Sequence, residues 1–295
     1  MIEALKQDNP GVEAVALYQD GEMVLTHYFK PHLPRLIYSH TKSFISTAAG
    51  IAIDEGKLSL DTEVGDLFPE YLPKITDERV GHIKLRHFLT MSSGFGEALV
   101  MDENRRNGEA YPDYVGYILG KELKYPSGEA FCYSNGDSHM VGCMVQRATG
   151  VPLLQYCYDR FFSKMGIGFP VWETDPQGTA FGGSGLYLTI TDMMKLGILY
   201  LHNGVWEGER LLSEEWVKAA ASKQIVVDPS GQIKDDYGYQ FWISGQREGV
   251  FRADGAYGQT TMVLPKENAV FATQCSEFND VPKFLSMVNR YINET

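Results

Sequence analysis

Strand-like segments lie at both ends of this chain of 295 residues, and helix-like segments fill the stretch between them. Near the start, residues 12–18 and 23–29 are rich in β-formers and flank an Asp-Gly turn, so they predict a hairpin. If strands from the two ends pair, they form one antiparallel sheet, and the middle of the chain becomes an inserted helical lobe. Further strand-like runs near the end would complete this sheet at 239–244, 249–253, 260–264 and 269–275.

Helical patterns dominate the middle of the chain. Residues 42–54 are apolar nearly all round, which is typical of a buried helix, and Gly56 supplies a C-terminal stop. Residues 137–148 form a second helical pattern, with Ser134 or Asn135 as its N-cap. Further helices are predicted at 85–91, 191–201 and 281–292.

We therefore expect an α+β protein, in which an antiparallel β-sheet is flanked by helices and carries an inserted, mainly helical lobe. A single domain would cover residues 1–295. Its sheet lobe would come from 1–35 and 236–295, and its helical lobe from 36–235.

The balance of charges restricts the partners. Asp and Glu number 38 against 26 Lys and Arg, so the net charge is −12. A nucleic acid or an anionic membrane would call for a basic face, and neither is expected as a partner. The start of the chain shows no secretory signal, and no apolar run reaches the roughly 20 residues of a membrane span. These features favour a cytoplasmic protein, and no pattern indicates an oligomeric state.

The sequence carries no recognisable metal or cofactor motif. The seven histidines are scattered, and the spacing of His82 and His87 does not suit a helical metal pair. The glycine-rich stretch 181–185 does not join a strand to a helix in a βαβ unit, as a phosphate loop would. The sequence therefore predicts no metal and no cofactor.

Ser39 and Lys42 open the most apolar helix of the chain, after a loop that contains two prolines. A serine hydroxyl is a poor nucleophile until a base removes its proton. Lys42 lies one helical turn away on the same face, and a buried lysine loses affinity for its proton and can act as a base. Chance supplies a Ser-x-x-Lys about once in a chain of this size, so the position of the pair carries the hypothesis.

Two further segments offer suitable chemistry. Tyr133 could exchange a proton with a nearby lysine, and Asn135 offers both a donor and an acceptor to a substrate amide. The alternative for this segment is a loop with a helix N-cap. Residues 251–259 contain glycines that would let a strand edge approach a ligand. The alternative there is a hairpin turn.

Together these segments resemble the serine β-lactamase and penicillin-binding-protein superfamily, and most closely its class C branch with the related esterases and amidases. Ser39-His40-Thr41-Lys42 matches the S-x-x-K motif, and Tyr133-Ser134-Asn135 matches Y-x-N. The resemblance runs from about Val12 to the C-terminus. Similar supporting segments are 85–94, 126–129, 185–194 and 201–216.

The resemblance implies a serine hydrolase without a cofactor. Ser39 would attack a carbonyl and form an acyl-enzyme, while Lys42 and Tyr133 move the proton. The backbone N–H groups of Ser39 and Ala256 would form the oxyanion hole. The substrate would be a small ester or amide, and the residues expected to bind it are Asn135, Ala253, Gly255 and Tyr257.

The third motif departs from the family pattern, because Ala253-Asp254-Gly255 stands where lactamases and transpeptidases carry K-T-G or H-x-G. The lysine of that motif binds the carboxylate of a β-lactam or a peptide terminus. Arg252 could supply a charge, but on a strand it shares a face with Asp254, and the two are expected to pair. We therefore predict an esterase or amidase. The alternatives are a β-lactamase or D-amino-acid peptidase and, in another class, a non-catalytic sensor.

Overall fold

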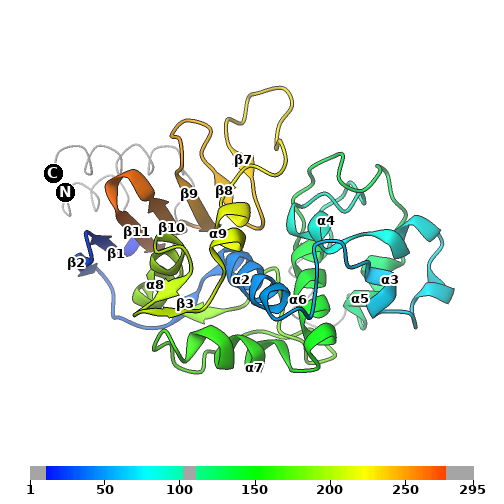
Figure 1. The fold of residues 1–295 in the computed structure, drawn as a ribbon, viewed down its shortest axis with the longest axis horizontal. Coiled ribbons are helices and arrows are strands. Elements are labelled where there is room, and N and C mark those ends of the chain that lie inside the picture. Colours follow the sequence, from blue (N-terminus) through cyan, green and yellow to red (C-terminus); the bar gives the residue numbers. More distant parts are fainter. Residues whose placement is uncertain (1–10, 102–110, 277–295) are drawn as a thin grey trace.

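Strands from the two ends of the chain pair in one antiparallel sheet, in the order β2-β1-β11-β10-β9-β8-β7 (Figure 1). This computed structural model describes residues 11–101 and 111–276. β1 joins the two ends: Val15 is registered with Thr273, and Tyr18 with Val270. The predicted antiparallel sheet is therefore confirmed. Its strands are β1 (Val12–Gln19), β2 (Glu22–Tyr28), β7 (Asp236–Tyr237), β8 (Trp242–Ile243), β9 (Phe251–Gly255), β10 (Gln259–Leu264) and β11 (Ala269–Cys275).

The predicted N-terminal hairpin is present as β1 and β2. Its turn places Asp20 at φ 51° and Gly21 at φ 92°, the positive values that two-residue hairpin turns require. Two small ladders join loops elsewhere. They pair β3 (Arg35–Leu36) with β4 (Tyr187–Leu188), and β5 (Val205–Trp206) with β6 (Glu209–Arg210).

Helices cover one face of the sheet and form the lobe beyond it (Figure 1). α8 packs on β1, β10 and β11, and α2 lies between the sheet and α6. The predicted helix at 281–292 lies outside the described residues. The described α-helices are α2 (Thr41–Asp54), α3 (Val64–Leu67), α4 (Leu85–Leu89), α5 (Tyr114–Leu119), α6 (Asn135–Thr149), α7 (Leu153–Cys157), α8 (Ile190–Leu201) and α9 (Glu214–Ala220). Short 3₁₀ or π turns are η1 (Tyr38–His40), η2 (Leu72–Lys74), η3 (Glu78–His82), η5 (Tyr158–Phe162) and η6 (Pro265–Glu267).

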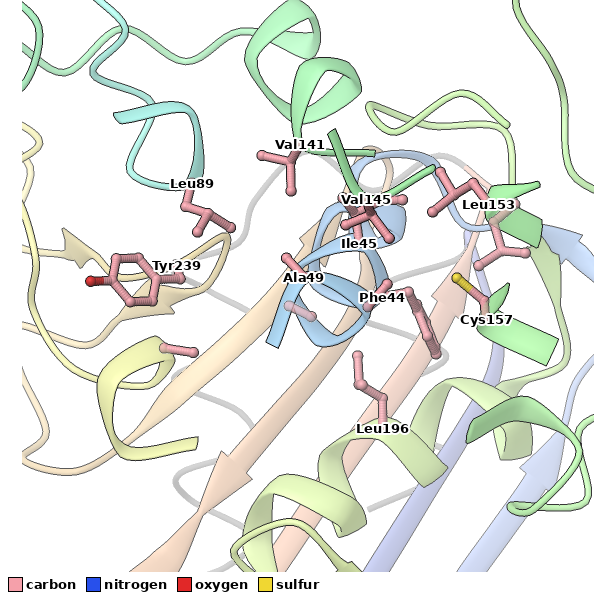
Figure 2. Packing of buried hydrophobic residues seen from close by; sticks show 14 of the residues in the cluster. Phe44, Ile45, Ala49, Leu89, Val141, Val145, Leu153, Cys157, Leu196 and Tyr239 are labelled. Carbon is pink, nitrogen blue, oxygen red and sulfur yellow. The ribbon is translucent and has the colours of Figure 1, made fainter. Parts of the chain in front are cut away.

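α2 is buried on every side, because its residues from Thr41 to Ala52 are shielded from solvent. Figure 2 shows Val145 of α6 beside Ile45, while Phe44 approaches Leu196 of α8. A helix enclosed on all sides needs apolar residues on all faces, which explains its all-round apolar pattern. The predicted buried helix is therefore confirmed.

One predicted strand is shorter than expected. The run 239–244 forms a strand only at Trp242–Ile243, because Gln240 adopts φ 62° and leaves the ladder. The Gln240 side-chain amide donates to the backbone oxygens of Phe88 and Leu89. A conformation that anchors α4 thus replaces the first part of the predicted strand.

All four cysteines are free, and Cys143, Cys157 and Cys275 are buried. Across residues 11–101 and 111–276, helices with both the length and the apolar character needed to cross a bilayer are absent.

Candidate active site

Ser39 lies in η1, and Lys42 lies in the first turn of α2 that follows. The Lys42 Nζ atom is 3.2 Å from the Ser39 Oγ atom. Tyr38, directly before Ser39, has φ 50°, a left-handed value that a bulky residue keeps only where its surroundings hold it. The serine and lysine of the predicted motif are therefore in hydrogen-bond contact.

Lys42 is a buried amine held by oxygen atoms from three parts of the chain. Its residue exposure is 1%. Besides Ser39, it donates to the Asn135 Oδ1 atom at 2.6 Å and to the Gly183 backbone oxygen at 2.6 Å. The Asn135 Nδ2 atom donates in turn to the Val100 oxygen. The structure thus places Asn135, which we predicted to bind substrate, against the proposed base.

Tyr133 completes this group from the loop before α6. Lys42 Nζ lies 4.9 Å from its ring centroid, and the Ser39 side chain interacts with its hydroxyl. Desolvation, with a smaller contribution from Asp254, raises the pKa of Tyr133 well above its usual value, although the interaction with Ser39 opposes the shift. The ring stacks on Trp242 at a centroid distance of 5.9 Å. The three predicted catalytic side chains therefore meet in one place.

The end of β9 lies against the segment that leads into Ser39. A Cβ on Gly255 would sit 2.1 Å from the Ile37 backbone oxygen, so this close approach requires a glycine. Tyr257, at φ 64°, packs its ring on Tyr38 at 5.2 Å. Ala256 lies between them, in the turn from β9 to β10. The oxyanion role of Ala256 stays a prediction.

Ala253 and Arg252 point to opposite faces of β9. The Ala253 side chain is buried in the main hydrophobic core, so only its backbone is available to a substrate. Arg252 Nε donates to Asp254 Oδ2 at 2.5 Å, and Arg252 Nη1 donates to Asp235 Oδ2 at 2.8 Å. The predicted pairing of Arg252 with Asp254 is confirmed, and Asp235 is a second partner that the sequence did not indicate.

The buried carboxyl group of Asp137 is hydrogen-bonded to a loop that packs beside Tyr133. Asp137, in the first turn of α6, accepts from the Ser93 hydroxyl at 2.9 Å and from the Ser93 N–H at 3.4 Å. Burial raises the pKa of Asp137 to about 7, although the Ser93 and Ser134 hydrogen bonds oppose the shift. The Ser93 oxygen accepts from the Ser127 hydroxyl. Asp137 thereby links α6 to the loops that precede Tyr133.

The Gly182-Gly183 segment was missed by sequence reasoning, which considered these glycines only as a phosphate loop. A Cβ on Gly182 would sit 2.3 Å from the Ser138 oxygen, and one on Gly183 would sit 2.7 Å from the Asn135 Cβ. Both glycines therefore lie directly on α6. Two consecutive glycines could have indicated a segment packed closely against a helix. Nothing in the sequence, however, shows that the Gly183 backbone carbonyl would face Lys42.

One group of potential metal ligands occurs among the described residues. The ligand atoms of His139, Cys143 and Asp175 all lie within 4.8 Å of one another, and all three residues are buried. However, the Gly182 N–H points at the His139 Nδ1 atom. A histidine that binds a metal through Nε2 needs a proton on Nδ1 and an acceptor facing it. The arrangement therefore fits a hydrogen-bond network better than a metal site.

The comparisons with known proteins agree with this geometry. The sequence profile of the family described as Beta-lactamase matches residues 1–287. The chain belongs to the beta-lactamase family. A relative in this family, the 6-aminohexanoate-dimer hydrolase of Paenarthrobacter ureafaciens, is 24% identical over 272 residues, or 85% of this chain and 69% of that protein. The predicted family and the predicted enzyme class, a hydrolase, are thereby confirmed.

Two solved structures show the same beta-lactamase-family fold. A candidate 6-aminohexanoate-dimer hydrolase from Bacillus anthracis has a TM-score of 0.81 at 21% identity, over 99% of this chain and 80% of that one. EstCE1, a hydrolase with promiscuous acyltransferase activity, has a TM-score of 0.74 at 17% identity, over 93% of this chain and 91% of that one. The predicted fold class is confirmed.

Proposed function

We propose that this chain is a serine hydrolase that cleaves small carboxylic esters or amides through an acyl-enzyme on Ser39. The observation that carries the proposal is the 3.2 Å hydrogen bond between Lys42 Nζ and Ser39 Oγ, with Tyr133 beside both. A nucleophile within hydrogen-bond reach of its base, and a base oriented by further groups, is the general signature of covalent catalysis.

In the proposed acylation, Ser39 Oγ attacks the substrate carbonyl carbon, and its proton passes to neutral Lys42. The carbonyl oxygen becomes an oxyanion, which the N–H groups of Ser39 and Ala256 would hold. As the carbon–oxygen or carbon–nitrogen bond breaks, Tyr133 gives its proton to the leaving alkoxide or amine, and the proton held by Lys42 passes to Tyr133, so both groups recover their starting states. Water attacks the ester on Ser39 in the second half, with the same groups moving its proton. The acid is released and Ser39 regains its hydrogen.

The substrate class follows from the cations near the site. Arg252 lies next to Ala253, which takes the place of the K-T-G lysine. The Arg252 side chain is 8% exposed and forms ion pairs with Asp235 and Asp254. A carboxylate-bearing β-lactam or peptide terminus therefore gains little from it. The similarity to the 6-aminohexanoate-dimer hydrolase of Paenarthrobacter ureafaciens supports a small amide or ester instead.

A fluorophosphonate probe tests the proposal directly. We expect one adduct on Ser39 at neutral pH, mapped by mass spectrometry, and no adduct in Ser39→Ala. Parallel assays with p-nitrophenyl acetate, an anilide and a chromogenic cephalosporin separate the alternatives. We expect ester turnover and little lactam turnover. Rapid cephalosporin hydrolysis would favour a β-lactamase, and an unlabelled Ser39 would favour a non-catalytic sensor.

A further inference from the structure

His139 bridges two parts of the loop that approaches Lys42. This residue of α6 is fully buried, and its ring is enclosed by Tyr114 and Phe181 at centroid distances of 5.5 and 5.3 Å. Its Nδ1 atom lies 3.4 Å from the Gly182 N atom, and its Nε2 atom lies 3.1 Å from Asp175 Oδ2. One imidazole thus binds the loop at two places that are seven positions apart in the chain.

The hydrogen-bond pattern assigns a role to each ring nitrogen. The Gly182 N–H can only donate, so Nδ1 must accept and carries no proton. Nε2 then carries the hydrogen and donates it to Asp175. Burial lowers the pKa of His139, whereas Cys143 and Asp175 beside it raise the pKa above its usual value. A proton added at Nδ1 would oppose the Gly182 N–H, so the contact to Gly182 favours the neutral ring.

Asp175 ties the bridge to the turn of the loop. Its Oδ1 atom accepts from the N–H groups of Gln177 at 2.9 Å and Thr179 at 2.8 Å. Its Oδ2 atom accepts from the His139 Nε2 atom. Asp175 is 4% exposed, so both oxygens are used inside the protein. His139 therefore anchors the loop to α6 at Asp175 and Gly182, and Gln146 of the same helix holds the turn between them by donating to the Thr179 hydroxyl at 3.1 Å.

The anchored loop ends on the proposed base. Gly183 follows Gly182, and its carbonyl accepts from Lys42 Nζ at 2.6 Å. The same glycine lies against Asn135, the other close partner of Lys42. A displacement of Gly182 from His139 would therefore move an acceptor of Lys42 by a similar amount.

From this geometry we infer that His139 is a positioning residue, which holds the Gly183 carbonyl against Lys42 by accepting from Gly182 N–H and donating to Asp175. The inference rests on the proposed function, because it concerns the base of that reaction. Loss of the Gly183 acceptor would leave Lys42 less precisely placed and its charged form less stabilised.

Three variants at one position test the inference. His139→Ala removes both bonds. His139→Asn keeps an acceptor near the Nδ1 position for Gly182, whereas His139→Gln keeps a donor that reaches toward Asp175 but loses the acceptor. The matched control is His202→Ala, which removes a histidine in contact with Tyr18 in another part of the molecule. Acylation by p-nitrophenyl acetate is measured from pH 5 to 10, together with kcat, KM and the thermal midpoint.

We expect His139→Ala to lower kcat roughly tenfold to a hundredfold with little change in KM. The pH of half-maximal acylation should fall by about one unit, because the lysine ammonium loses a stabilising acceptor. His139→Asn should recover most of the rate, His139→Gln should not, and the His202 variant should match the wild type. A purely structural role would lower the thermal midpoint and leave the pH profile in place.

Wild-type acylation separates the two proposals. If the wild type is labelled on Ser39 and the His139 variants keep its rate and pH profile, the inference on His139 is wrong and the proposed function stands. A rate for His139→Gln above that of His139→Asn would also overturn the inference. If His139→Ala does not fold, the order of the Asn and Gln variants still decides. An unlabelled wild type would contradict the proposed function itself.

Discussion

Two buried basic side chains, those of Lys42 and Arg252, are held by different kinds of partner. Lys42 donates to neutral oxygens of Ser39, Asn135 and Gly183. Arg252 donates to carboxylates of two aspartates and lies over the Trp242 ring, 5.7 Å from its centroid. Both side chains are removed from water, and the arginine is matched by two opposite charges.

The two kinds of partner suit Lys42 and Arg252 to different roles. Burial lowers the pKa of Arg252, but Asp254 and Asp235 outweigh burial and raise it, so this residue stays charged. Its place is structural: it ties β9 to the loop that carries Asp235. A neutral oxygen, by contrast, can hold an amine in position without requiring that it stay charged. The neutral oxygens around Lys42 are therefore compatible with a base that gains and loses a proton.

The largest expected effect comes from making Lys42 resemble Arg252. Lys42→Arg keeps the positive charge but introduces a group that does not lose its proton in proteins. We expect Ser39 acylation to fall by about 10³-fold or more, as for loss of a general base acting on a nucleophile. Lys42→Ala should be equally inactive. A Lys42→Arg enzyme with more than about a tenth of wild-type acylation would contradict the role of base.

The next effect is on stability, at the other cation. Arg252→Met should lower the free energy of unfolding by about 3–5 kcal/mol, because it leaves two mostly buried carboxylates without their cation. Urea unfolding measures the change. The matched control is Arg79→Met, which removes an arginine that is 59% exposed in its pair with Asp77 and should therefore cost far less stability. Equal losses for the two variants would show that burial does not separate these pairs.

The smallest expected effect is the pH dependence of stability that comes from Asp137, a third buried ionisable group. Neutral groups of Ser93 donate to Asp137, just as neutral oxygens accept from Lys42. Its folded-state pKa of about 7 lies above the usual value. Between about pH 4 and 7 the unfolded chain therefore loses this proton first, and folding stability falls as pH rises.

Asp137→Asn removes this titration. Relative to wild type, the variant should gain about 2–3 kcal/mol of unfolding free energy between pH 5 and pH 8. Urea unfolding at both pH values gives the difference. A constant offset between the two proteins would mean that Asp137 is already ionised at pH 5 in the folded state.

The spacing of apolar and charged residues along the sequence predicted those features that depend on neighbours within one strand or helix. The period-two alternation of β9 gave the Arg252–Asp254 pair, and the all-round apolar pattern gave α2. Gln240 shows the limit, because its hydrogen bonds to α4 override the strand pattern around it. Gly183 shows a second limit: its contribution is a backbone carbonyl, 141 positions from Lys42 in the chain, and a carbonyl has no signature in the sequence.

The enclosure of α2 has a consequence for how this protein can change. A helix that contacts the sheet and α6, with Phe44 beside Leu196 of α8, tolerates few substitutions, because its side chains are packed on every side. Adaptation to a new substrate would therefore proceed through the surrounding loops, while the element that carries Lys42 stays constant. For the same reason, a local fluctuation that exposes α2 would open most of the core, so heat should abolish activity and tertiary structure together.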